Sequence, residues 1–127
     1  MQPKKIGIGI VVIIVIGIIA AVGGSSGGAP SNAVVNNAPG SSTPGCEPDC
    51  FIPTTATIRA GGTITWMNGD TAAHTATAGT AGDGPSGVFD SSLIMAGASY
   101  SHTFEAAGTF DYFCMVHPWM SGVVIDR

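Results

Sequence analysis

A chain of 127 residues, 45% of them hydrophobic, provides enough side chains for one compact domain and little else. Its formal net charge at pH 7 is −4, and after residue 45 two arginines stand against eight acidic residues. Because binding to phosphates needs clustered lysine and arginine, this balance argues against nucleic acid as a partner.

The chain begins with a basic and then an apolar segment. Lys4 and Lys5 precede an unbroken run of apolar residues and glycine over residues 6–22. As a helix this run would span roughly 26 Å, about the hydrocarbon thickness of a bilayer. Residues 1–22 therefore fit an uncleaved membrane anchor, and they also fit a cleaved secretory signal because small residues follow the apolar run. The positive-inside rule places the rest of the chain outside the cytoplasm, either membrane-anchored or secreted or periplasmic.

Residues 23–45 consist mostly of glycine, serine, proline and asparagine. Such a segment predicts a flexible linker after the apolar helix. The short run at residues 33–35 is too brief to predict a strand. We therefore expect one folded, monomeric domain over residues 46–127, small enough that a disulfide or a metal would help to stabilise it.

Short runs of β-branched and aromatic residues, separated by turn residues, dominate this domain. Such runs predict strands, and no window sustains a helical period. About seven strands at this spacing predict an all-β sandwich or barrel. The clearest expected strands are residues 57–59, 63–67, 99–104, 109–113 and 123–125.

Three cysteines in an exported protein suggest one disulfide and one remaining thiol. Cys46 and Cys50 enclose Glu-Pro-Asp, and a turn with proline brings two such cysteines within disulfide reach. An oxidising compartment favours this bond. Cys114 is then the free thiol, which is easily oxidised unless it is buried or bound to a metal.

Cys114 opens a group of soft ligands that continues with His117 and Met120. Pro118 cannot continue a strand ladder, so the strand should end near Cys114 and become a loop. A loop, unlike a strand, can turn several nearby side chains toward one point. Thiolate, thioether and imidazole together are the ligands that select copper.

Copper of this type takes a second imidazole, and two histidines remain. His74 follows the strand expected at residues 63–67 and lies in a polar stretch. His102 lies within the strand expected at residues 99–104, between polar neighbours, where a lone histidine is ordinarily a surface residue.

These residues resemble the small blue copper proteins, or cupredoxins, and within them the plastocyanin and amicyanin group. The family pattern is a histidine followed later by Tyr-x-Cys-x-x-His-Pro-x-Met, which His74 and residues 112–120 match with the short loop spacing of amicyanins. The resemblance implies a Greek-key β-sandwich that holds one mononuclear type 1 copper ion. His74, Cys114 and His117 would be its main ligands and Met120 its weak axial ligand. The implied function is the transfer of single electrons between redox proteins.

The ligand loop also carries apolar residues that must lie near the surface, namely Met115, Pro118 and Trp119. They fit a small surface around His117 where a redox partner docks. Trp119 fits core packing equally well, because tryptophan is often buried.

Two positions depart from the family pattern. Val116 stands where proline is usual, and we expect its N–H to reach the thiolate of Cys114 and favour copper(I). Thr75 stands where asparagine is common, and we expect its hydroxyl to tie the two ligand-bearing segments together.

Three alternatives stay open. A small copper oxidoreductase that acts on a small molecule would need an open axial position, and no general acid or base is evident beside the loop. A copper storage or delivery protein would need the same ligands. A binuclear copper centre would need two bridging cysteines on the histidine loop, whereas Cys46 and Cys50 precede His74.

Overall fold

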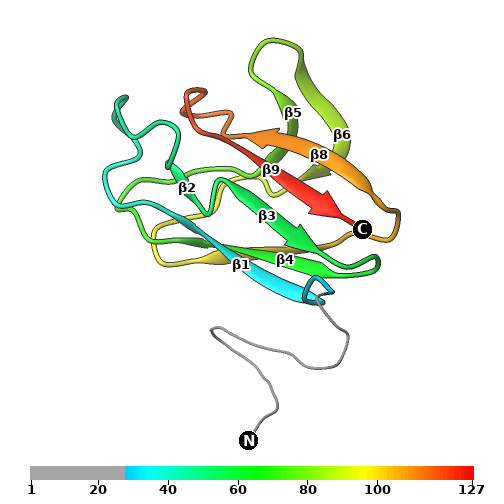
Figure 1. Cartoon of the computed structure of the whole chain (residues 1–127). Coiled ribbons are helices and arrows are strands. Elements are labelled where there is room, and N and C mark those ends of the chain that lie inside the picture. Colours follow the sequence, from blue (N-terminus) through cyan, green and yellow to red (C-terminus); the bar gives the residue numbers. More distant parts are fainter. Residues whose placement is uncertain (1–27) are drawn as a thin grey trace, which may run out of the picture.

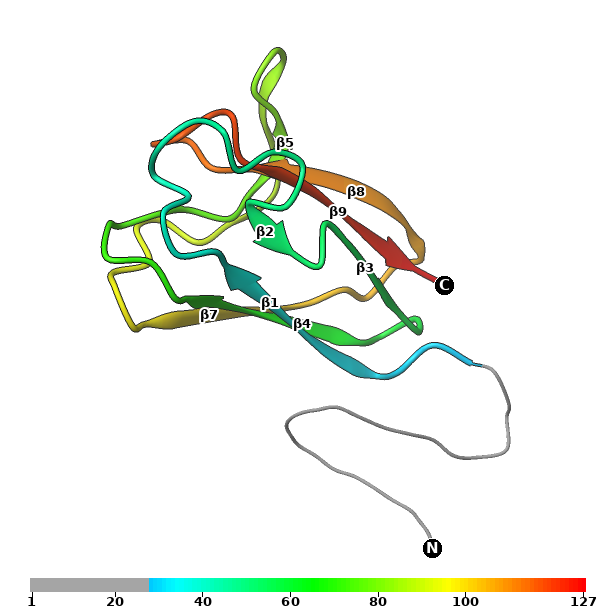
Figure 2. The ribbon, with the colours of Figure 1, turned by 60° about the vertical axis from the view of Figure 1, so that its left-hand side comes forward.

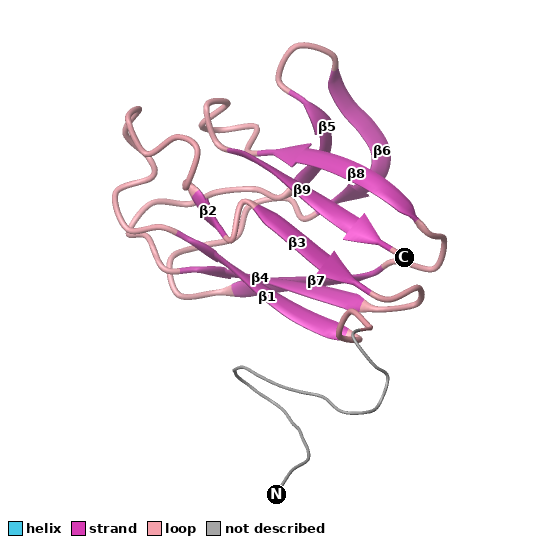
Figure 3. Cartoon of the chain, in the orientation of Figure 1, coloured by secondary structure: helices cyan, strands magenta, loops and turns pink. Residues whose placement is uncertain are grey.

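The computed structural model describes residues 28–127, and every regular element in this range is a strand. The strands form two sheets that pack face to face (Figure 1, Figure 3). The first sheet has the order β2-β1-β4-β7, with bounds β1 Asn32–Asn37, β2 Phe51–Ile52, β4 Thr63–Asn68 and β7 Ser99–Thr103. The second has the order β3-β9-β8-β5-β6, with bounds β3 Thr55–Ile58, β5 Thr77–Thr80, β6 Gly84–Asp90, β8 Gly108–Phe113 and β9 Ser121–Asp126.

The all-β sandwich expected from the sequence is confirmed, whereas the Greek-key connection pattern stays a prediction. The apolar helix expected over residues 6–22 lies outside the described residues. Within residues 28–127, no helix is long and apolar enough to cross a membrane.

The first strand lies inside the segment that we expected to be a linker. β1 pairs in parallel with β4 over its whole length, from Asn32 opposite Thr63 to Asn37 opposite Asn68. Val35 is fully buried on its inner face. The boundary expected near Cys46 is therefore wrong, because backbone pairing with a central strand orders a segment whose polar composition alone favours disorder.

Two strands of the second sheet were also missing from the sequence-based expectation. β5 contains Ala78 and Gly79, and its register with β6 shifts between Thr77 and Gly79. β6 begins with Gly84 and Pro85. These residues have low strand propensity, and the pairing of β5 with β8 and of β6 with β5 overrides it. The five strands that were expected are all present, with shifts of at most a few residues at their ends.

Trp66 is fully buried between the two sheets and joins them through aromatic contacts. Its ring lies 5.2 Å from Phe89 and 5.2 Å from Tyr112 of the second sheet, and 5.8 Å from Tyr100 of its own sheet. Such pairs contribute about 0.5 to 1.5 kcal/mol each beyond the burial of their area. They fix β4, which carries Trp66, relative to β8, which carries Tyr112.

The loops that follow β1, β4 and β8 gather at one end of the sandwich, opposite the C-terminus (Figure 1, Figure 2). The loop after β4 leads to His74, and Cys114 follows β8 directly. The packing of β4 against β8 therefore sets the distance between the two ligand-bearing segments.

Candidate metal centre

Three side chains that were predicted as ligands meet at this end of the sandwich. The Cys114 sulfur lies 3.7 Å from Nδ1 of His74 and 3.9 Å from Nδ1 of His117. The two Nδ1 atoms lie 3.0 Å apart. Cys114 and His74 are fully buried, while His117 is only partly buried. Three soft or borderline donor atoms thus face one point beneath the surface.

The loop from Cys114 to Met120 is closed by its own backbone. The N–H of Cys114 donates to the carbonyl of Met120 at 3.1 Å, and the N–H of Met120 donates to the carbonyl of His117 at 2.9 Å. These bonds turn the chain back into β9 at Ser121. Met120 is fully buried, so its thioether lies on the inner side of the loop.

Two backbone N–H groups point at the Cys114 sulfur. Thr75 donates from 3.3 Å and His117 from 3.4 Å. The expectation that Val116 supplies this bond is not met in the described structure, since the loop aims the N–H of the next residue at the sulfur. The Thr75 hydroxyl accepts the N–H of Met115 at 2.9 Å and so joins the two ligand-bearing segments.

The other nitrogen of His74 faces a buried carboxylate that the sequence analysis missed. Nε2 of His74 lies 2.7 Å from Oδ2 of Asp70, and the Gly40 N–H donates to Oδ1 of Asp70 at 2.9 Å. Burial alone would raise the pKa of Asp70, but hydrogen bonds from His74 and from the N–H groups of Gly40 and Thr71 outweigh it and hold that pKa well below the usual range. The only sequence signal was an acid four residues before His74.

Trp119 connects the ligand loop to the loop after β1. Its indole N–H donates to the carbonyl of Ser41 at 2.9 Å, and its ring packs 5.3 Å from that of His117. Met115, Val116 and Pro118 are exposed around them. Burial lowers the pKa of His117, and His74 lowers it further, although Asp70 acts in the opposite direction. A neutral imidazole is the form that binds a metal.

The remaining cysteines and the third histidine lie apart from this group. Cys46 and Cys50 form the expected disulfide. Their thiols are thus not free for the binuclear copper centre considered above. His102 is not the second imidazole: it packs against Phe89 and Phe104, with ring centroids 5.0 and 4.7 Å away.

Comparison with known proteins covers the part of the chain that carries these ligand residues. The family described as copper binding proteins, plastocyanin/azurin family, matches residues 49–125. The chain belongs to this family. The match begins at residue 49, and most of the loop after β1 lies before it.

Individual relatives agree with that membership. An amicyanin from Paracoccus versutus is 35% identical over 83 residues, which cover 64% of this chain and 61% of the amicyanin, so the chain spans about three fifths of that relative. A plastocyanin from Scenedesmus fuscus is 37% identical over 73 residues, covering 53% of this chain and 74% of the plastocyanin. A solved structure described as a novel purple cupredoxin from Nitrosopumilus maritimus superimposes with a TM-score of 0.69 at 26% identity, covering 75% of this chain and 99% of that one.

The residues present fit the copper that this plastocyanin/azurin family binds. Ligand atoms that share one ion at about 2.0 to 2.3 Å lie within about 4.6 Å of one another. All three distances among the Cys114 sulfur and the two Nδ1 atoms meet that condition. Two imidazoles and a thiolate, with a methionine in the same loop, are the donors of blue-copper sites.

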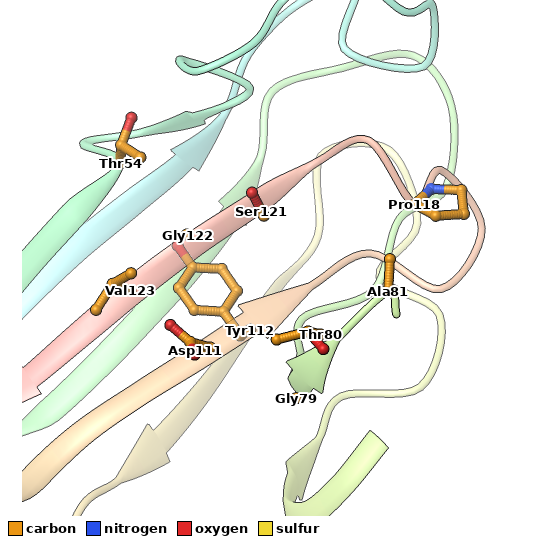
Figure 4. A pocket seen from close by; sticks show the side chains of 10 residues that line it. All are labelled: Thr54, Gly79, Thr80, Ala81, Asp111, Tyr112, Pro118, Ser121, Gly122 and Val123. Atoms are coloured by element: carbon orange, nitrogen blue, oxygen red, sulfur yellow. The ribbon is translucent and has the colours of Figure 1, made fainter. Parts of the chain in front are cut away.

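A hollow of about 370 Å³ lies on the second sheet near the ligand loop (Figure 4). None of the copper ligands lines it, and its ionisable side chains are Asp111 and the buried Tyr112. It therefore contributes nothing to the copper site. Its lining residues are Thr54, Gly79, Thr80, Ala81, Asp111, Tyr112, Pro118, Ser121, Gly122 and Val123.

Proposed function

We propose that this protein carries single electrons between redox partners outside the cytoplasmic membrane, with one mononuclear type 1 copper ion as its cofactor. The observation that carries the proposal is the convergence of the Cys114 sulfur with the ring nitrogens of His74 and His117, with Met120 buried in the same loop. Bound copper supplies a one-electron couple, and a trigonal ligand set with a long axial thioether suits both of its oxidation states.

The ligands are held in place by the protein itself. Two N–H groups bind the Cys114 sulfur, and the bond from Met115 to Thr75 links the two segments that carry the ligands. Most aromatic side chains of the core behind them are buried. A site whose ligands are fixed by packing and hydrogen bonds needs little rearrangement when it gains or loses an electron.

His117 is the ligand through which we propose that electrons enter and leave. It is the one imidazole of the site that is partly exposed, whereas His74 is fully buried. Met115, Pro118 and Trp119 surround it, and the exposed Val116 extends the same apolar surface. A small apolar surface of this kind suits brief docking of a redox protein.

The location is part of the proposal. We infer that residues 6–22 either anchor the protein in the membrane or direct its export, which places the copper domain on the extracytoplasmic side. The Cys46–Cys50 disulfide supports an oxidising compartment. We propose that the domain works as a monomer.

The first test is spectroscopic. The full chain loaded with copper(II) should show intense visible absorption from charge transfer between the thiolate and copper, and Cys114→Ser should abolish it. His102→Gln is the matched control, since His102 lies outside the ligand group and its loss should leave the colour unchanged. A colourless protein that holds zinc tightly would refute the proposal.

Kinetics separate a carrier from the other copper proteins considered. A carrier should exchange electrons rapidly between its own oxidised and reduced copies and should show no sustained turnover of small oxidants or reductants. Sustained turnover would indicate an oxidoreductase instead. Slow self-exchange together with rapid transfer of copper to a chelator would indicate storage or delivery.

A further inference from the structure

Asp70 is a buried acid whose two oxygens are both engaged at the copper site. Only 3% of its side chain is exposed. Oδ2 lies 2.7 Å from Nε2 of His74, and Oδ1 accepts the Gly40 N–H at 2.9 Å. The N–H of Asp70 itself donates to Oδ1 of Asn68 at 2.9 Å, which fixes the backbone from which the carboxylate projects.

This contact assigns different roles to the two nitrogens of His74. A carboxylate only accepts hydrogen bonds, so Nε2 must carry the hydrogen. Nδ1 is then unprotonated, and Nδ1 is the atom that faces the Cys114 sulfur and the ring of His117. The Ser41 hydroxyl lies 3.4 Å from the same Nε2, beyond the more favourable distance of the carboxylate.

We propose that Asp70 is a positioning residue of the copper site, which fixes the orientation and tautomer of His74 and strengthens Nδ1 as a donor. This inference rests on the copper carrier proposed above. A hydrogen bond to an ionised acceptor is roughly twice as strong as one to a neutral acceptor, and a carboxylate partner makes a ligating imidazole more basic. A more basic ligand stabilises copper(II) more than copper(I), so Asp70 lowers the reduction potential.

The loop after β1 takes part in this arrangement. Gly40 supplies the second hydrogen bond to the carboxylate, and Gly40 lies before the region matched by the plastocyanin/azurin family. A carboxylate that is buried without partners is strongly unfavourable, so Asp70 needs the N–H of Gly40 as well as that of His74. The loop after β1 therefore acts on the copper site through Asp70.

Substitution of Asp70 separates its charge from its shape. Asp70→Asn keeps the size of the side chain and removes the charge. We expect it to weaken copper(II) binding about tenfold more than copper(I) binding, which raises the reduction potential by about 59 mV for one electron. Asp70→Glu restores the charge and should recover at least half of that shift, even where the extra methylene lowers the melting temperature.

Asp83→Asn is the matched control, because it removes one negative charge from an exposed turn that lies outside the ligand group. It should leave the potential unchanged. If Asp70→Asn shifts the potential no more than Asp83→Asn does, or no more than Asp70→Glu does, the inference is wrong. Absence of the charge-transfer band in the unsubstituted protein would instead refute the proposed carrier.

A measurement on the unsubstituted full chain does not depend on how the variants fold. Nitrogen-15 NMR of the copper(I) form distinguishes the two nitrogens of His74. The inference requires hydrogen on Nε2, held in a strong hydrogen bond, and a metal on Nδ1. The opposite assignment would overturn it.

Discussion

The sulfur of Cys114 is the atom on which most contacts of the site converge. It accepts the N–H groups of Thr75 and His117 and lies close to both Nδ1 atoms. Hydrogen bonds to a thiolate withdraw electron density from it and so favour copper(I). Because both donors are backbone N–H groups, we expect the conformation of the two segments that carry them to set the reduction potential of bound copper.

Val116→Pro tests which donors matter. Proline has no N–H, but the N–H of Val116 is not one of the two that bind the sulfur in the described structure. We therefore expect the potential measured by redox titration to change no more than in the control Val116→Ala, which keeps the N–H. A fall in potential confined to the proline variant would show that residue 116 donates to the thiolate after all.

Met120→Leu tests the weak axial donor. The side chain is fully buried, and leucine has a similar volume, so the variant should fold with a loss of less than about 1.5 kcal/mol. We expect copper and colour to be retained and the potential to rise, because a thioether stabilises copper(II) more than copper(I). Complete loss of copper binding, measured by metal analysis, would show that Met120 is a main ligand or is needed for folding.

At the scale of elements, the loop between β1 and β2 supports the site from the N-terminal side. Gly40 binds Asp70, and the Ser41 carbonyl accepts the indole N–H of Trp119. The Cys46–Cys50 disulfide closes the far part of the same loop, and the Cys46 sulfur lies 3.9 Å from the Ser41 carbonyl. This loop therefore contacts the partners of both imidazole ligands.

Removal of the disulfide should weaken this support. In the chain-entropy model a bond that closes so short a loop stabilises the fold by about 2 kcal/mol. The double variant Cys46→Ser, Cys50→Ser should lose about that free energy of unfolding in a denaturant titration, and Trp119 fluorescence should report a looser environment. Ser42→Ala, in the same loop but outside the disulfide, is the control. Equal stability of the double variant and the control would contradict a bracing role.

At the scale of the whole molecule, what the sequence predicted depends on how far apart the contacting residues are. Cys114, His117 and Met120 lie within one loop, so their residue types and short spacing, together with the family resemblance, indicated a copper site. The bond from Trp119 to Ser41 spans 78 positions, and the one between Ser41 and His74 spans 33. Contacts of this kind leave no local pattern, because they arise only when two sheets pack.

The same reasoning explains the errors in the fold. β1 has the composition of a linker, and only its pairing with β4 makes it a strand. β5 and β6 contain glycine and proline, so their local propensity argued against them. Strands with β-branched and aromatic residues, such as β4 and β9, were predicted because their local preference agrees with their place in the sandwich.

His102 makes the stability of the fold depend on pH, and this dependence is separate from the copper site. Its ring packs between Phe89 and Phe104, and burial lowers its pKa, although the charge of Glu105 acts in the opposite direction. The unfolded chain, with a histidine pKa of about 6.5, therefore binds more protons than the folded chain as the pH falls through that value. Stability is fully present above this pH and declines below it.

His102→Phe removes the titrating group and keeps an aromatic ring against the same two phenylalanines. The melting temperature of the copper-loaded protein should fall between pH 7.5 and pH 5.5, values chosen to lie about one unit on either side of the unfolded pKa. In His102→Phe this fall should be smaller, since the remaining histidines are the proposed copper ligands in both proteins. Identical pH profiles for the two proteins would show that His102 takes up its proton as readily when folded as when unfolded. The pH dependence would then have to come from protonation of a ligand, and it would be accompanied by loss of the visible absorption.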